Sequence, residues 1–288
     1  MRIGVTFPQT ELGGDASAVR TYGQTVEELG YTHLLAYDHV VGADPEVHEG
    51  WAGPYDIHTT FHEPLVMFGY LAAVTTRLEL VTGVIILPQR QAVLVAKQAA
   101  EVDLLSEGRL RLGVGLGWNA VEYEALNEDF SNRGKRLAEQ VEVMRRLWTE
   151  QSVTFAGKHH RVTGAGLAPM PIQRPIPVWV GAASRPALER AGRLADGWFP
   201  MTTVPGPKLD EARDIVAQAA TAAGRDPSQL GMEGRVTWAG DPQQVAEELS
   251  EWEAAGATHM TINTMGAGLR TVDEHLAALA AVAETLAA

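Results

Sequence analysis

The chain has 288 residues, of which 23 are Lys or Arg and 36 are Asp or Glu, so its formal net charge is −13. This acidic balance argues against nucleic acid or an anionic membrane surface as a general partner. The sequence contains no cysteine, which excludes disulfides, thiolate metal sites, iron–sulfur clusters and cysteine nucleophiles.

Short apolar strands alternate with amphipathic helices along the whole chain. Strands are expected at 2–7, 32–36, 78–87, 109–114, 177–180, 197–200, 231–238 and 258–263. Helices are expected between Asp15 and Gly30, from Pro64 onward, and at 92–105, 131–148, 184–194, 208–223, 241–255 and 271–286. The first helix is typical, because Asp15 can cap its first turn and Gly30 suits the residue after its last turn.

Alternating strands and helices predict a parallel sheet, and eight such units in 288 residues fit one (β/α)8 TIM-barrel domain over residues 1–288. Two segments are too long for routine connections: residues 42–62 after the second strand and residues 153–174 before the fifth. The second should contain a small hairpin. Loops that follow barrel strands lie on the catalytic face, so residues 42–62, hereafter the lid, are a candidate cover for the site.

The glycine-rich segment from Gly113 to Asn119 follows the fourth expected strand and opens a helix. From Gly115 onward it matches the loose G-x-G-x-x-A dinucleotide pattern. A Rossmann domain is the weaker interpretation, because that pattern normally belongs to the first βαβ unit. Glycines at a strand end let the backbone approach a flat or phosphorylated ligand, although they can also serve packing alone.

Asp38 and His39, which follow Tyr37 at the end of the second strand, are candidate acid–base residues. Histidine side chains titrate near neutral pH, and a carboxylate can orient or perturb them. The alternative is that Asp38 caps a loop and His39 is a polar surface residue.

The segment from Gly181 to Ser184 follows the fifth strand and precedes Pro186 in the first turn of a helix. Small residues before a Ser-capped helix leave backbone N–H groups free at the helix N-terminus, where an anion such as phosphate binds well. A plain Ser-capped helix without a ligand is the alternative.

Three histidines, His48, His58 and His62, lie in the lid. The spacing of His58 and His62 would suit a metal on a helix, but H-E-x-x-H is absent and Pro64 places a helix start after them. A solvated lid is the preferred interpretation, and no metal site is expected.

Taken in order, these motifs resemble the bacterial luciferase-like family, and within it the branch that depends on the deazaflavin coenzyme F420. The resemblance covers essentially the whole chain. It rests on segments 37–40, 63–64, 81–88, 97–100, 113–119, 122–126, 133–134, 177–181 and 195–198.

The resemblance implies a (β/α)8 barrel that binds a flavin-type ring at its C-terminal mouth. Gly83 and Val84 match a bulge in the third strand, often built with a non-proline cis peptide bond, that presses on the back of the ring. Asp38 and His39 match residues near the reactive edge of the ring. The loop beside the ring is matched by Gly115, Leu116, Gly117, Trp118 and Asn119. The phosphate-binding turn is matched by Gly181, Ala182, Ala183 and Ser184.

One departure from the family pattern narrows the chemistry. Sugar-phosphate-oxidising members carry a glutamate directly after the Gly-x-Gly of the fourth strand, where this chain has Trp118. With only four lysines in the chain, the basic residues expected around a sugar phosphate are not evident either. Sugar-phosphate oxidation is therefore not expected. An apolar or aromatic substrate under a lid that carries Trp51, Tyr55 and His58 fits better.

The resemblance thus predicts an oxidoreductase that transfers a hydride between coenzyme F420 and a small organic substrate, with His39, oriented by Asp38, as proton donor or acceptor. With FMN instead, the same fold would support oxygen activation and monooxygenation. A flavin- or deazaflavin-binding protein without turnover is a third interpretation. The anionic tail of the coenzyme would need local donors near Ser184, with Arg185 and Arg90 as candidates.

Location and assembly are predicted from weaker signals. Arg2 leads directly into a strand and not into an apolar leader, and no apolar run approaches the roughly 18 residues of a membrane helix. These features predict a cytoplasmic protein with no membrane or nucleic-acid partner, and the family resemblance implies a homodimer.

Overall fold

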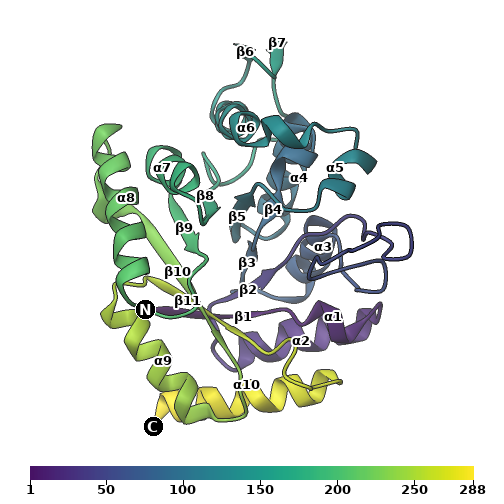
Figure 1. Cartoon of the computed structure of the whole chain (residues 1–288), viewed down its shortest axis with the longest axis vertical. Coiled ribbons are helices and arrows are strands. Elements are labelled where there is room, and N and C mark those ends of the chain that lie inside the picture. The colour runs from purple at the N-terminus through teal and green to yellow at the C-terminus, as the bar shows by residue number, and fades with distance from the viewer.

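The strands of the computed structural model, which describes residues 1–288, form a closed parallel barrel with helices around it (Figure 1). Its strands are β1 (Arg2–Thr6), β2 (His33–Ala36), β3 (Glu79–Thr82), β4 (Ile85–Ile86), β5 (Leu110–Gly115), β8 (Val178–Ala182), β9 (Gly197–Pro200), β10 (Gly231–Thr237) and β11 (His259–Asn263). On one side of β1 the sheet continues with β11, β10, β9, β8, β5 and β4. On the other side it continues with β2 and β3, and pairing of β3 with β5 closes the ring. The predicted (β/α)8 barrel is confirmed.

The helices begin within two residues of the expected positions. Asp15 caps α2 by accepting from the Ser17 N–H (2.8 Å), and Thr271 forms a capping box with Glu274 at the start of α10. The helices are α1 (Gln9–Leu12), α2 (Ala16–Glu28), α3 (Pro64–Val74), α4 (Ala92–Leu105), α5 (Ala120–Ala125), α6 (Arg133–Thr149), α7 (Arg185–Leu194), α8 (Pro207–Ala222), α9 (Pro242–Ala254) and α10 (Val272–Ala287). Three short 3-10 helices are η1 (Leu87–Gln89), η2 (Phe130–Asn132) and η3 (Pro227–Gln229).

The third barrel strand is divided in two, where the periodicity predicted one strand over 78–87. Strand β3 pairs with β2 and β5, whereas β4 pairs with β5 alone. The break lies at the peptide bond between Gly83 and Val84, which is cis, as the family resemblance implied. A side chain at position 83 would collide with Leu35, whose Cδ2 lies 2.4 Å from the place of a Cβ.

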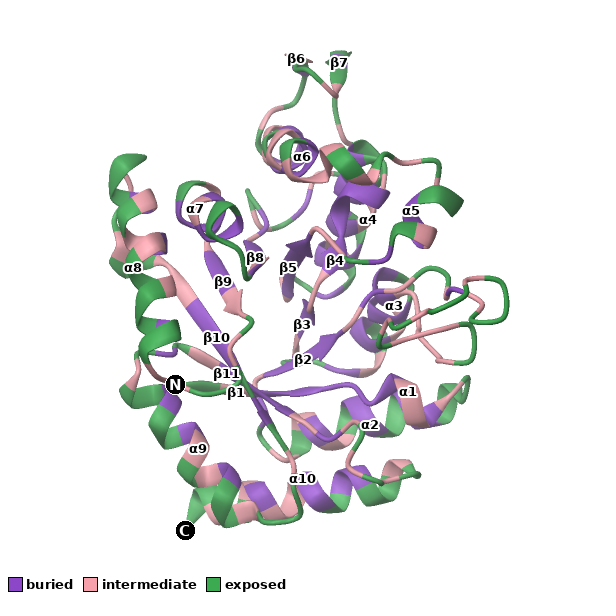
Figure 2. Cartoon of the chain, in the orientation of Figure 1, coloured by how far each residue is buried: buried purple, intermediate pink, exposed green.

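The two long segments differ in kind. Residues 153–174 contain the expected hairpin, whose strands β6 (Val153–Ala156) and β7 (Arg161–Ala165) pair antiparallel. The lid contains turns and bends but no helix or strand, and most of its residues are exposed or half-buried (Figure 2). Because the lid follows β2, it lies at the C-terminal end of the barrel.

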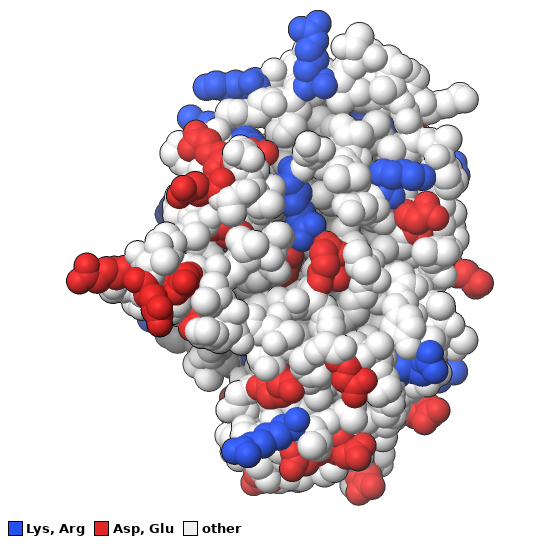
Figure 3. All heavy atoms as spheres, turned by 90° about the vertical axis from the view of Figure 1, so that its right-hand side faces the viewer, with Lys and Arg blue, Asp and Glu red and all other residues white.

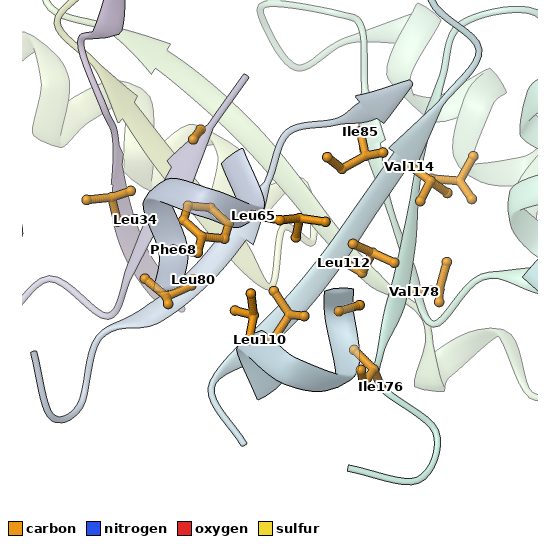
Figure 4. Packing of buried hydrophobic residues seen from close by; sticks show 14 of the residues in the cluster. Leu34, Leu65, Phe68, Leu80, Ile85, Leu110, Leu112, Val114, Ile176 and Val178 are labelled. Atoms are coloured by element: carbon orange, nitrogen blue, oxygen red, sulfur yellow. The ribbon is translucent and has the colours of Figure 1, made fainter. Parts of the chain in front are cut away.

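Strand residues alternate between two environments. The outward side chains pack against the helices in a cluster of 58 buried hydrophobic residues, in which Leu80 lies beside Phe68 of α3 (Figure 4). The inward side chains in the N-terminal half of the barrel are charged. Arg111 is bonded there to Glu233 and, at 3.1 Å, to Glu79. This polar layer lies in the N-terminal half of the barrel interior.

No helix has the length and apolar character that crossing a bilayer requires. No group of three histidine or carboxylate side chains has a geometry that could hold a metal ion.

Candidate active site

Glycines occupy inward positions where β3, β5 and β8 end at the barrel mouth. Gly113 and Gly115 continue the inward alternation that begins with Arg111, and the Cβ of a residue at 115 would lie 2.4 Å from Val84 Cγ2. Gly181 faces Val84 from the other side, with 3.4 Å between its own Cβ position and Val84 Cγ1. The mouth therefore has a smooth floor on this side, from which the half-buried side chain of Val84 projects.

Asp38 is a structural anchor in this mouth. Its carboxylate, of which 1% is exposed, accepts from the Ile86 N–H (2.9 Å) and from Arg90 Nη2 (2.7 Å). It therefore ties the loop after β2 to the segment after the cis peptide. The expectation that Asp38 orients His39 is wrong, because both oxygens of Asp38 are directed to these other partners.

Arg90 is held by two carboxylates. It donates to Glu63 at 2.9 Å in addition to Asp38. Burial acts to lower the pKa of Arg90, but these two carboxylates outweigh it and raise the pKa above its ordinary value. Arg90 is therefore a permanent cation inside an ion-pair network, and it is not free to bind the phosphate or tail of a coenzyme.

The partner of His39 is Glu122, from α5. His39 Nδ1 lies 3.5 Å from Glu122 Oε2, and the Glu122 side chain is 1% exposed. The same carboxylate accepts from Gln89 Nε2 at 3.0 Å and from the N–H groups of Val40 and Val41. Burial acts to raise the pKa of Glu122, but the hydrogen bonds from His39, Gln89 and Val40 outweigh it and hold the pKa below its usual value. Glu122 is thus an anion that fixes His39 and the backbone beside it.

Aromatic side chains of the lid and of the loop after β5 surround His39. Its ring centroid lies 4.7 Å from that of Phe61, 5.1 Å from that of Tyr55 and 5.6 Å from that of Trp118. The His39 side chain is 13% exposed, and the structure gives its Nε2 no protein partner. A cavity of about 200 Å³, lined by His39, Tyr55, Phe61 and Asn119 among others, opens beside it. The arrangement places one imidazole nitrogen without a protein partner beside aromatic rings and this cavity.

The sequence contained one signal for Glu122 that was not interpreted. Asn119 caps α5 by accepting from the N–H groups of Val121 (3.1 Å) and Glu122 (3.4 Å), and a Glu three residues after an N-cap is the spacing of a capping box. Here Glu122 does not turn back to its own helix. Its backbone partners lie more than 80 residues earlier in the chain, in the loop after β2.

The loop from Gly115 to Asn119 lies beside the lid. Gly117 has φ +64°, and a side chain there would also meet Ile86 Cγ2 at 2.7 Å. Leu116 is half-buried, and its carbonyl accepts from the Tyr123 hydroxyl (2.7 Å). Trp118 is 40% exposed and packs its ring 5.7 Å from that of Trp51, so the loop and the lid touch through two indoles.

The turn from Gly181 to Ser184 opens onto the surface beside this mouth. Ser184 is the N-cap of α7, as expected, but its hydroxyl makes no capping hydrogen bond, so the first N–H groups of α7 have no side-chain acceptor. Ala182 is buried, whereas Ala183 and Ser184 are exposed. A cavity of about 410 Å³ adjoins the turn, and its lining includes Arg185 and Lys208. The local donors that an anion needs are present here.

The lid histidines do not converge. His62 packs against Phe7 at 5.8 Å, His48 lies 6.3 Å from the ring of Trp51, and the backbone N–H of His58 donates to Asp56. On the face of the molecule that carries the lid, basic side chains are scattered among acidic ones and are not joined into one patch (Figure 3).

Comparisons with known proteins agree with this architecture. A profile of the luciferase-like monooxygenase family matches residues 1–237. An uncharacterized protein of Mycobacterium tuberculosis is 33% identical over 208 residues, which make up 72% of this chain and 71% of that protein. A Nocardia farcinica protein named F420-dependent glucose-6-phosphate dehydrogenase is 31% identical over 247 residues, with 81% of this chain and 68% of that protein covered. The solved structure of an F420-dependent secondary alcohol dehydrogenase with an F420–acetone adduct matches 98% of each chain with a TM-score of 0.79 at 18% identity, which is a likeness of fold.

Proposed function

The chain belongs to the luciferase-like monooxygenase family, and on that basis we propose that it is an oxidoreductase that transfers a hydride between the deazaflavin coenzyme F420 and a small organic substrate. A relative that is 31% identical over most of this chain bears the name of an F420-dependent dehydrogenase, which supports the coenzyme. We do not extend the sugar-phosphate substrate of that relative to this chain, because Trp118 stands where sugar-phosphate-oxidising members carry a glutamate and the chain has only four lysines.

The observation that carries the proposal is the floor of the barrel mouth. Val84 projects between Gly115 and Gly181, and the lack of side chains at these glycines leaves room for a planar ring to lie on the valine. The rim of this floor carries His39. A ring on the floor would thus have an apolar support on one face and a proton-exchanging group near its edge.

The anionic end of the coenzyme fits the turn from Gly181 to Ser184. The uncapped N–H groups of α7 provide donors with a favourable helix dipole, and Arg185 and Lys208 add positive charge to the adjoining cavity. These local donors are needed because the chain carries a net charge of −13.

When bound, the coenzyme supplies or accepts the hydride, and the chain provides positioning, exclusion of water and a proton. We assign the proton exchange to His39 Nε2, since Nδ1 is directed to Glu122. Asp38 contributes by holding the segment around Ile86 in place. The lid aromatics exclude water from the imidazole and provide an apolar surface for the substrate.

The cofactor assignment is tested by titrating the purified chain with F420 and, separately, with FMN, and following the fluorescence of each. We expect micromolar or tighter binding of F420, which Gly115→Leu weakens at least tenfold because the new side chain fills the space above the floor. Tight binding of FMN together with no binding of F420 would instead support an FMN-dependent monooxygenase.

The role of His39 is tested in the F420 complex. The complex with reduced coenzyme is mixed anaerobically with a panel of aldehydes, ketones and quinones, and the return of oxidised coenzyme is followed by absorbance. We expect His39→Gln to slow the reaction with the best acceptor about 100-fold or more without changing the Kd for F420. His160→Gln, in the loop between β6 and β7, is the matched control. Equal rates for wild type and His39→Gln would contradict the assignment, and binding without turnover of any acceptor would favour a cofactor-binding protein.

A further inference from the structure

The wall of the mouth opposite the glycine floor carries a cation that the proposed hydride transfer does not use. In β10, Glu233 points into the barrel, and the alternation of the strand places Arg235 and Thr237 on the same inward side. Both residues are exposed, whereas Val236 between them is 1% exposed and packs outward in the core. Inward residues that remain exposed to solvent show that this side of the mouth is open.

Arg235 has one protein partner, the hydroxyl of Tyr37, to which its Nη1 donates at 3.1 Å. The structure shows no carboxylate within ion-pair distance of it. Arg111, one layer deeper, is the informative contrast, because it faces the same interior and is bonded to both Glu79 and Glu233. A guanidinium has five N–H donors, so most of those on Arg235 remain available for a ligand.

The surroundings of Arg235 connect it to His39. Its partner Tyr37 directly precedes Asp38 and His39 after β2, so the guanidinium lies beside the segment that carries His39, whose ring packs against Tyr55. Glu11 accepts from the Gly266 N–H (2.8 Å) and the Thr10 hydroxyl (2.7 Å) and forms no ion pair with Arg235. Arg235 therefore lies at the mouth beside the segment that carries His39 and has no ion-pair partner.

We propose that Arg235, supported by Tyr37, binds the carboxylate of the substrate, so that the substrate class is an organic acid with an apolar body. The planar fork of a guanidinium matches a carboxylate in charge and geometry. A single arginine suits one negative charge, whereas a phosphate ester of nearly two charges would call for further cations beside Arg235. The apolar body would lie against Tyr55 and Phe61, which brings it to His39. This inference rests on the proposed function only for the identity of the reaction.

The test compares acid and amide pairs of the same shape: cinnamate with cinnamamide, benzoate with benzamide, and hexanoate with hexanamide. Binding is measured at pH 7 by isothermal titration calorimetry, with the full chain alone and with the chain saturated with F420. We expect at least one acid to bind about tenfold or more tightly than its amide, in line with the worth of a charge-assisted hydrogen bond. Arg235→Gln should abolish that difference, and Arg235→Lys should retain part of it. Benzyl phosphate should bind to the wild type no more tightly than benzoate.

Arg213→Gln is the matched control, since it removes the same charge from an exposed arginine on α8 that is paired with Asp210 at 3.7 Å. This variant should leave the acid preference intact. The Kd for F420 should be the same in the three variants and the wild type. An acid preference that survives Arg235→Gln, or the lack of an acid preference in every pair, would overturn the proposal. Failure of the chain to bind F420 would refute the proposed cofactor while leaving the acid preference measurable on the chain alone.

Discussion

At the scale of single residues, the site depends on carboxylates that gather several donors each. The buried carboxylate of Glu122 pairs with His39 and accepts hydrogen bonds from Gln89 and from two backbone N–H groups of the segment after β2. Asp38 likewise accepts hydrogen bonds from the Ile86 N–H and from Arg90. A buried carboxylate is stable only when its lone pairs are satisfied, so each of these residues fixes the position of the backbone that satisfies it.

Replacing Glu122 with glutamine should loosen the lid without unfolding the barrel. Glutamine keeps the size of the side chain and one carbonyl acceptor, but it loses the charge that strengthens the hydrogen bonds from Val40 and Val41. We expect hydrogen exchange in segment 40–62, followed by mass spectrometry, to become about tenfold faster, which corresponds to a loss of about 1–2 kcal/mol in local stability. Glu124→Gln, an exposed change on the same helix, should leave the exchange unaltered. Unchanged protection in Glu122→Gln would show that the lid does not depend on this carboxylate.

At the scale of elements, the floor of the mouth is made by strands that approach one another at glycines. Gly113 of β5 lies so close to β3 that a Cβ would be 1.9 Å from the Thr82 carbonyl oxygen and 2.9 Å from the ring of Phe199. The Thr82 hydroxyl also donates to the Gly113 carbonyl at 2.7 Å. Because a Cβ at position 113 would clash with the backbone of β3, the two strands themselves would have to move apart.

Gly113→Ala should therefore destabilise the protein, whereas the same substitution on a helix should not. We expect Gly113→Ala to lower the free energy of unfolding by about 2–3 kcal/mol or more, as overpacking in a core does. Gly69→Ala in α3, where a Cβ would meet nothing within 4 Å, should raise it by about 0.5–1 kcal/mol, because alanine favours the helix. Urea unfolding followed by circular dichroism measures both. Effects of the same sign for the two variants would contradict this account of the floor.

The elements themselves could be predicted from sequence because their signals are local. The apolar alternation of β10 and the Asp15 cap of α2 depend on residues a few positions apart, and both lie where expected. The short α1 after Pro8 was missed, since four residues carry too little periodicity. The division of β3 from β4 was anticipated only through the family resemblance, because the apolar run over 78–87 continues through it.

The partners of the site residues could not be predicted in the same way. The sequence places Asp38 next to His39, which favours a pair, but neighbouring residues after a strand tend to point in opposite directions. Asp38 instead meets Arg90, 52 residues later, and His39 meets Glu122, 83 residues later. Such pairs are set by which barrel loops converge, and a single sequence without the packed barrel does not show the register of that convergence.

At the scale of the whole molecule, the barrel holds a charged layer below its mouth. Burial acts to raise the pKa of Glu233, but Arg111 and His33 outweigh it and hold that pKa well below its ordinary value. His259 closes the layer on the side of Trp179, with ring centroids 4.9 Å apart. Burial, and next the charge of Arg111, lower the pKa of His259 to about 3. The layer is thus built for an ionised Glu233 and a neutral His259.

The stability of the protein should therefore fall as the pH falls, beginning with the histidine. The unfolded chain binds a proton at His259 below about pH 6.5, whereas the folded chain does not until about pH 3, so each step of acidification in this window favours unfolding. Glu233 acts in the same direction at lower pH, because the stability it contributes is present above about pH 4.3 and is lost below it.

The variant His259→Gln removes the contribution of the histidine alone. We expect the wild type to lose about 1–2 kcal/mol more than this variant between pH 7 and pH 5 in urea unfolding, while His58→Gln, on the exposed lid, should follow the wild type. Other histidines with lowered pKa values, His160 and His275, contribute equally to both chains and cancel in the difference. Parallel stability curves for the wild type and His259→Gln would mean that the layer accepts a proton at this position without cost, and that the barrel interior is more hydrated than its packing indicates.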